Sequence, residues 1–224
     1  MDARGTLQVF RPVDFAREDD SSDEAFYRRP RFVNHLDSLA TATVEDVYSR
    51  LILRSSRVLD LMAGPDSHLR PELEPRTVSG LGLNEEELGA NPILSEWVIH
   101  DLNACPALPF EDNRFDVVIN TVSVDYLTRP IEVFRDVNRI LGSGGLFIVV
   151  FSNRMFPTKA VNIWRITRES KRPDLVRKFF SEAGRFSIEG FFESKNKPRP
   201  TDDKYYSLGI PSDPVYALWG KVTK

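Results

Sequence analysis

Apolar residues recur along this chain at two spacings, which predict helices alternating with strands. In the segment 35–53, Leu36, Val44 and Leu51 belong to a set spaced mostly three or four residues apart, as on one face of a helix. Short apolar runs with few polar breaks follow, as in strands that are buried on both faces. The predicted strands cover residues 57–62, 76–83, 96–102, 115–122 and 144–152. The predicted helices cover residues 84–90 and 130–141, with helical material continuing to about residue 183.

The C-terminal part of the chain carries two β-like runs without a helix between them. These runs cover residues 185–194 and 213–223, and a polar loop containing prolines joins them. Strands connected by helices pair in parallel, whereas two strands without a crossover helix pair antiparallel. The chain is therefore predicted to be an α/β protein with a doubly wound, seven-stranded mixed sheet and an antiparallel C-terminal hairpin.

The first 30 residues lack this periodicity. They mix charges, two prolines and few apolar positions, so we expect an N-terminal arm over residues 1–30 that is loosely held and docks through Phe26 or Tyr27. A chain of 224 residues supplies enough material for one full-sized core. Residues 31–224 are therefore expected to form a single domain.

Composition narrows the classes of function. The formal net charge of -3 offers no basic footprint for nucleic acid. The longest purely apolar run, residues 146–151, is far shorter than the roughly 18 residues of a spanning helix. A lone cysteine, Cys105, and three scattered histidines predict neither a disulfide nor a metal site. An acid-rich N-terminus without an apolar leader favours the cytoplasm. We expect no nucleic-acid or membrane partner, and the oligomeric state is not encoded in any pattern we find.

Polar side chains stand where several predicted strands end. In open α/β sheets, ligands bind outside the carboxyl ends of the strands, at the point where the strand order reverses. These ends carry Asp60, Asn84, Asp101, Thr121 and Asn153. The pattern predicts a ligand site at this edge of the sheet.

Several segments in this order resemble the class I S-adenosylmethionine-dependent methyltransferases. They are "VLDLMAGPDSHL" (58–69), "VSGLGLNEEEL" (78–88), "LPFEDNRFDVV" (108–118) and "RILGSGG" (139–145). The resemblance runs from about residue 57 to the C-terminus. More narrowly, "GLGLNEEEL", "DLN" and "FSNRMFPTKA" are similar to small methyltransferase-like proteins of unassigned substrate.

The resemblance implies a Rossmann-like methyltransferase fold, S-adenosylmethionine as cofactor and a small-molecule acceptor. By its motifs, Asp60 would orient the first loop and the methionine part of the cofactor, and Asp101 would accept a hydrogen bond from the adenine amino group. The cofactor-binding residues that it implies are Asp60, Met62, Ala63, Gly64, Leu83, Asn84, Asp101, Leu102, Asn103 and Thr121.

The chain departs from the family pattern at two anchors. Met62 and Asp66 occupy two of the three glycine positions of the first loop, and a carboxylate at Asp66 would repel the cofactor's carboxylate unless it faces away or caps a turn. Gly82 stands where most relatives carry an acid that grips the ribose. Losing such a contact costs roughly 1.5 to 3 kcal/mol. Gly82→Asp is therefore expected to strengthen binding if this position faces the ribose.

Methyl transfer is an in-line displacement that needs positioning and, for some acceptors, a base. It requires no fixed triad, so the catalytic residues stay unknown from the sequence. The candidates near the predicted pocket are His68, Asp125, Tyr126 and Arg154.

The segment 154–178 holds eight Lys or Arg against two acids. It is either a solvated helix face or a rim at which Arg154, Lys159 and Arg165 bind an anionic acceptor.

Two rival functions remain at this stage. One is a degenerate methyltransferase fold that serves as a non-catalytic binding or regulatory module, which the weakened anchors favour. The other is a dehydrogenase on a similar sheet, which the missing glycines disfavour because a dinucleotide needs them for its pyrophosphate.

Overall fold

A computed structural model describes residues 5–223 of the protein and confirms the predicted sheet. The strand order is β3-β2-β1-β4-β5-β7-β6, and β7 alone runs antiparallel to its two neighbours. The strands are β1 (Arg57–Leu61), β2 (Thr77–Gly82), β3 (Glu96–Ile99), β4 (Phe115–Thr121), β5 (Leu141–Phe151), β6 (Phe186–Ser194) and β7 (Val215–Val222). The strand order reverses between β1 and β4, which places the switch point at their carboxyl ends.

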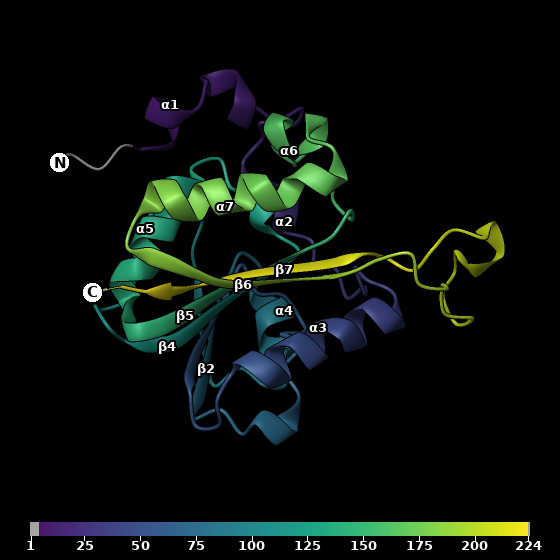
Figure 1. Ribbon diagram of the computed structural model, residues 1–224, viewed down its shortest axis with the longest axis horizontal. Helices are drawn as coiled ribbons and strands as arrows, with labels where there is room; N and C mark the ends of the chain where they lie inside the picture. Colours follow the sequence, from purple (N-terminus) through teal and green to yellow (C-terminus); the bar gives the residue numbers. More distant parts are fainter. Residues whose placement is uncertain (1–4, 224) are drawn as a thin grey trace.

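Helices cover both faces of the sheet (Figure 1). Helices α5 and α7 lie on one face, and α3 and α4 lie on the other. The helices are α1 (Thr6–Val9), α2 (Asp23–Tyr27), α3 (Ser38–Leu51), α4 (Glu85–Ala90), α5 (Pro130–Ile140), α6 (Asn162–Ile166) and α7 (Arg172–Ala183).

Alternating residues of one strand enter different cores, as the two-residue period of a strand requires. In β1, Val58 joins the core beneath α3, whereas Leu59 and Leu61 join the core formed with α5 and α7. All three side chains are fully buried. This explains why the sequence of the central strands is almost continuously apolar.

Strand β3 ends earlier than predicted. The sequence predicts a strand to residue 102, but the ladder with β2 stops at Ile99. The reason is local, because the Asp101 side chain accepts hydrogen bonds from the backbone of Asn103 and Ala104, at 2.8 and 3.2 Å, and turns the chain.

The N-terminal segment from Gly5 to Pro30 is packed against the rest of the protein rather than loosely held. Thr6 is fully buried; its backbone N–H donates to Glu132 Oε1 at 3.0 Å, and its hydroxyl accepts from the Ile131 N–H at 3.1 Å. Phe15 lies in the main core. Composition gave no sign of these contacts, since they join segments far apart in sequence. The division into an arm and one domain of residues 31–224 stays a prediction.

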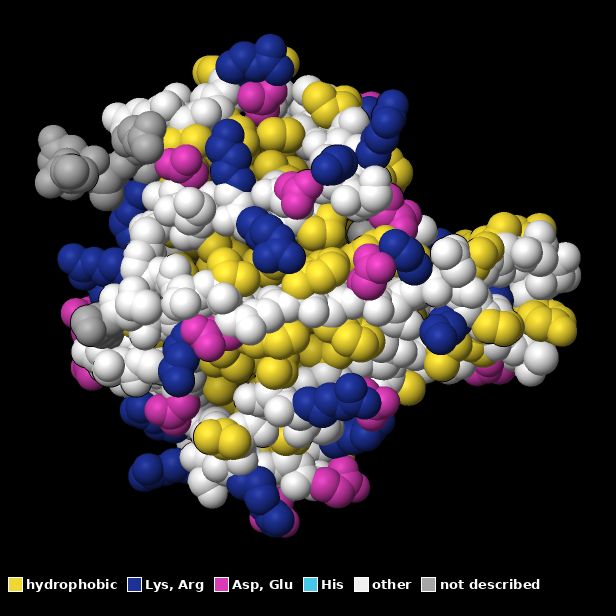
Figure 2. Space-filling model, viewed as in Figure 1, with side chains coloured by type: hydrophobic (Ala, Val, Ile, Leu, Met, Phe, Trp, Pro, Cys, Tyr) yellow, Lys and Arg dark blue, Asp and Glu magenta, His cyan; other side chains and the backbone are white. Residues whose placement is uncertain are grey.

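The β6–β7 connection projects from the body of the protein (Figure 1). At its base, Arg199 donates to Asp213 at 2.7 Å, and the Asp37 carboxylate accepts from the Asp213 N–H at 2.6 Å. The outer part exposes Tyr206, Leu208 and Ile210, and apolar side chains are visible on this projection in Figure 2. Between residues 5 and 223, no helix has the length and apolar character that crossing a membrane would take.

Candidate functional site

The loop after β1 keeps a glycine-like backbone where the glycine is missing. Met62 has φ 64°, in the left-handed region that side chains disfavour. The Ala63 N–H donates to the Leu81 carbonyl at 2.8 Å, and the Gly64 carbonyl accepts from Asn91 Nδ2 at 2.9 Å. The loop therefore holds its shape through hydrogen bonds to β2 and to the residue that ends α4, even with Met62 in a strained conformation.

A second strained residue lies after the neighbouring strand β4. Val122 has φ 43°, which is unusual for a β-branched residue. Beside it, the Thr121 hydroxyl lies 2.6 Å from the Tyr48 hydroxyl, and Asn120 Nδ2 donates to the Leu61 carbonyl at 2.9 Å. Strained backbone persists only where surrounding contacts enforce it, and it concentrates at functional sites. Here both residues follow the two strands that form the switch point.

Asp60 at the end of β1 is buried, and its pKa is unusually high for an aspartate. Burial raises its pKa to about 6, although a hydrogen bond from Ser67 and the nearby His68 oppose the rise. Such a carboxyl can orient the loop, as predicted. Its contact with the cofactor stays a prediction.

Asp66 and His68 form a local pair in the same loop. Asp66 accepts from the His68 N–H at 2.7 Å, and the ring Nδ1 of His68 lies 3.1 Å from the same carboxylate. The interaction with His68 lowers the pKa of Asp66. The Asp66 carboxylate thus caps its own turn, the alternative under which it does not oppose a bound carboxylate.

Gly82 has no room for the acid that most relatives carry. A Cβ at this position would lie 2.5 Å from the Ala63 carbonyl oxygen and 3.2 Å from Leu88. This geometry argues against the expectation that Gly82→Asp strengthens cofactor binding, because the loop after β1 fills the space that the side chain needs.

We expect Gly82→Ala to destabilise the protein by about 1 to 3 kcal/mol, the usual cost of overpacking, and Gly82→Asp to bind S-adenosylhomocysteine no better than the natural protein. Urea unfolding and calorimetric titration measure the two effects. Gly89→Ala is the matched control, since its Cβ would meet only Trp97 at an ordinary 3.7 Å. Tighter ligand binding by Gly82→Asp would contradict this reading of the loop.

The polar residues predicted to hold adenosine are largely occupied by the N-terminal segment. Asn84 caps α4 by accepting from the Glu87 N–H at 3.0 Å, and its Nδ2 donates to the carbonyls of Tyr27 and Arg28 at 2.8 and 3.1 Å. Asn103 Nδ2 donates to Asp23 and to the Tyr126 carbonyl, at 2.8 and 2.9 Å.

The other residues predicted to contact the cofactor differ in whether they are still free to bind it. Asp101 uses Oδ1 for its turn, which leaves Oδ2 to accept from a ligand. Leu83 is partly exposed, whereas Leu102 is buried in the main core. The backbone at Gly64 is open, since a Cβ there would meet only Glu87, at 3.6 Å. The loop after β1 and Asp101 therefore fit a nucleoside cofactor, whereas Asn84 and Asn103 would first have to exchange partners.

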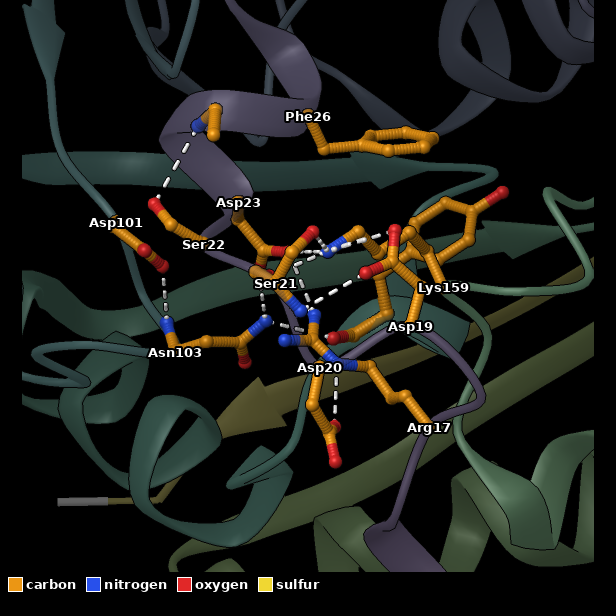
Figure 3. Close-up of polar contacts among 12 residues, drawn as sticks. Arg17, Asp19, Asp20, Ser21, Ser22, Asp23, Phe26, Asp101, Asn103 and Lys159 are labelled. Atoms are coloured by element: carbon orange, nitrogen blue, oxygen red, sulfur yellow. Dashed lines mark hydrogen bonds and ion pairs between the residues drawn. The ribbon is translucent and has the colours of Figure 1, made fainter.

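A buried ionic cluster fixes α2 over this edge (Figure 3). Asp23 accepts from Arg17 Nη1 at 2.7 Å and lies 3.2 Å from Lys159 Nζ. Lys159 is fully buried and also donates to the Ser21 carbonyl at 2.6 Å. Burial by itself would raise the pKa of Asp23, but hydrogen bonds from Asn103 and Arg17 outweigh it and hold that pKa below its usual value. Asp23 therefore stays ionised and joins three segments of the chain.

The catalytic candidates lie in different surroundings. Asp125 is buried in the 3-10 turn after β4, and its Oδ2 has no hydrogen-bond partner within residues 5–223. The Tyr126 hydroxyl accepts from the Phe156 N–H at 2.8 Å, so it is already engaged. Arg154 is partly exposed, with its Nε 4.0 Å from Asp213. Among these candidates and His68, Asp125 is the one with a buried, unsatisfied carboxyl oxygen.

The N-terminal contribution to this edge is not predicted by the sequence pattern. The acid-rich run "REDDSSDE", which contains Asp23, stands out by its charge alone, and no motif marks Arg31 as a ligand-binding residue. A periodic signal would not have found either, because their partners lie in distant segments. The "DLN" motif gave the one available indication, since its Asn103 is the residue that binds Asp23.

Two cavities lie away from the predicted residues. One of about 340 Å³ is lined by Leu69, Pro71, Pro75, Val78, Pro92, Ile93 and Ser95. The other, of about 300 Å³, lies at the opposite ends of the strands and includes Arg57, Thr77 and Arg114. Over residues 5–223, the side chains do not assemble a group of three or more His, Cys, Asp or Glu that could hold a metal ion.

Comparison with known proteins finds one matching family model and several similar structures. Residues 72–149 match the family model described as a methyltransferase domain. An S-adenosylmethionine-dependent methyltransferase from Mesorhizobium loti is similar in structure, with 18% identity and a TM-score of 0.54 over 79% of this chain and 95% of that one. No curated protein matches the sequence.

Two further solved structures are similar. A chain from a complex with the Haloferax volcanii Trm112 methyltransferase activator has 17% identity and a TM-score of 0.57, over 83% of this chain and 91% of that one. The [4+2]-cyclase SpnF has 14% identity and a TM-score of 0.56, over 82% and 81%. At these identities the likeness establishes the fold, and a fold alone does not fix the chemistry.

Proposed function

We propose that this chain is a class I S-adenosylmethionine-dependent methyltransferase that transfers a methyl group from S-adenosylmethionine to a small-molecule acceptor, because its strand order and the methyltransferase-domain match over residues 72–149 both fit that superfamily. The observation that carries the proposal is the loop after β1. Met62 is held in a glycine conformation at the switch point, beside the buried Asp60. Keeping such strain is expected where a ligand needs the backbone in that shape.

The bound cofactor would supply the activated methyl group, and the protein would position the two reactants. Residues 62–64 would support the methionine part from below, and Asp101 would accept from the adenine through Oδ2. Asp125 would receive the proton of an acceptor that carries one, since its buried Oδ2 lacks a partner within residues 5–223 and burial raises its pKa to about 7. A base of that pKa suits proton transfer near neutral pH.

Calorimetric titration with S-adenosylmethionine and with S-adenosylhomocysteine tests the proposal. We expect both to bind, and Asp101→Ala to weaken binding about tenfold, as the loss of one hydrogen bond to a ligand should. Glu111→Ala is the control for removing an exposed acid from the segment that follows β3. If neither ligand bound at millimolar concentration, the enzyme proposal would fail and a non-catalytic module would be the better description.

A further inference from the structure

Arg31 lies among aromatic rings near the same edge of the sheet. Its guanidinium carbon is 4.4 Å from the centre of the Phe26 ring, 5.3 Å from that of Tyr27 and 5.4 Å from that of Phe156. Its Nη2 donates to the Phe26 carbonyl at 2.8 Å. Phe156 follows β5, so the rings bring Arg31 to the carboxyl end of a central strand.

One side of the Arg31 guanidinium is left without an acceptor. Its Nη1 is buried and has no hydrogen-bond partner between residues 5 and 223. The Glu87 carboxylate contacts Arg31, but it accepts from the backbone N–H, at 2.6 Å, and not from the guanidinium. Burying an N–H donor without a partner is unfavourable, and a guanidinium is satisfied best by the two oxygens of a carboxylate.

His35 lies against the same group of aromatic rings. The His35 ring packs edge-on against Phe156 at 5.6 Å. Desolvation lowers the pKa of His35, and the charges of His68, Arg154 and Arg31 lower it further, so the ring is neutral near pH 7. The Asp66 carboxylate lies 3.1 Å from the His68 ring, and the Glu87 carboxylate is engaged by the Arg31 backbone N–H. Neither acid accepts a hydrogen bond from Arg31 Nη1.

Of the three cations that the sequence suggests for binding an anionic acceptor, two already pair with acids. Lys159 lies in the cluster with Asp23, and Arg165 pairs with Glu18. Arg154 approaches Asp213 only to 4.0 Å. Its guanidinium lies over the Tyr205 ring, at 5.4 Å, so none of the three reaches Arg31 Nη1 as a competing group.

We propose that Arg31 binds the carboxylate of a small-molecule ligand at the carboxyl edge of the sheet. This inference deepens the proposed function and rests on it. The carboxylate has two possible sources, the methionine part of the cofactor or an anionic acceptor, and both present the same two oxygens to Arg31.

The test compares ligands with and without the carboxylate in Arg31→Gln. S-adenosylhomocysteine carries the methionine-type carboxylate, whereas 5′-methylthioadenosine lacks it. A second titration adds benzoate, or the uncharged benzamide, to protein saturated with S-adenosylhomocysteine. Arg29→Gln is the matched control, since it removes the same charge from an exposed position of the same segment. Equal urea midpoints for the two variants would show that the segment stays folded.

Two results support the proposal. If Arg31 binds the cofactor, Arg31→Gln weakens S-adenosylhomocysteine binding by roughly tenfold or more, as expected for a charge-assisted contact, and leaves 5′-methylthioadenosine unchanged. If Arg31 binds the acceptor, both nucleosides bind as before, while benzoate binding is lost and benzamide never binds. Arg31→Lys should fall between the natural protein and Arg31→Gln, since it keeps the charge without the fork.

Two results overturn it. In the first, Arg31→Gln weakens neither S-adenosylhomocysteine nor benzoate. In the second, it weakens the two nucleosides equally, as a structural role would. Failure of the proposed function looks different, because the natural protein would then bind neither nucleoside. Benzoate titration of the ligand-free protein and of Arg31→Gln would still decide whether Arg31 binds a carboxylate.

Discussion

Asp23→Asn is expected to lower the free energy of unfolding by about 3 to 5 kcal/mol, the usual cost of removing one partner from a buried ion pair. The substitution keeps the size of the side chain but removes the charge that faces both Arg17 and Lys159. Their side chains are 9% and 0% exposed, so water cannot replace the lost carboxylate. Urea unfolding at pH 7 measures the change. The free energy should fall in one cooperative transition, because the cluster joins the N-terminal segment to the core.

Asp20→Asn is the matched control for this prediction. Asp20 lies three residues away in the same cluster, but its side chain is 79% exposed. Its carboxylate comes no closer to Arg17 Nε than 3.8 Å. An exposed pair contributes at most about 1 kcal/mol, so this variant should unfold almost as the natural protein does. Equal effects of the two substitutions would show that the buried position of Asp23 is not what matters.

The pH dependence of this effect has a definite sign. Because the pKa of Asp23 is lowered in the folded protein, its stabilising contribution is present above the pKa of the unfolded chain and is lost as the pH falls. The difference between Asp23→Asn and the natural protein should therefore shrink below about pH 4.

Asp125→Asn is expected to have the opposite effect on stability. Burial raises the pKa of Asp125 from 3.8 to about 7, so folding above pH 4 must either bury a charge or take up a proton. At 1.36 kcal/mol per pKa unit, the gain from removing the charge is at most about 4 kcal/mol. The variant should be similar to the natural protein near pH 3 and increasingly more stable up to pH 7, with a constant gain above it.

Urea unfolding at pH 3.5, 5, 7 and 8 measures this trend. Asp174→Asn on the exposed side of α7 is the control, and its stability should follow that of the natural protein within about 0.5 kcal/mol. A gain that did not grow with pH would mean that the Asp125 carboxylate is satisfied in the folded protein.

The same substitution connects stability with the proposed chemistry. If Asp125 receives the acceptor's proton, Asp125→Asn should slow methyl transfer roughly 10²- to 10⁴-fold, the usual contribution of a positioned base. Cofactor affinity should not change. A variant that is more stable and less active is the signature of a residue kept for function at the expense of stability.

The sequence by itself determined the fold and which residues stand where the strands end. The apolar spacing identified all seven strands and the helices between them, because the period of a strand or helix is a local property of the backbone. It also placed Asp60 at the end of its strand and Asp101 and Asp125 after theirs, where parallel strands end together. The antiparallel C-terminal hairpin followed from the missing crossover helix.

Only the tertiary structure decided how that edge is filled. Asn84 and Asn103 are bound by the N-terminal segment, and the hydrogen bonds that do this join residues 56 to 80 positions apart. The space at Gly82 is closed by Ala63, which belongs to another loop. Residue type and local spacing state which groups a side chain can bind. They do not state which distant segment reaches it first, because that depends on how the packed layers bring separate parts of the chain together.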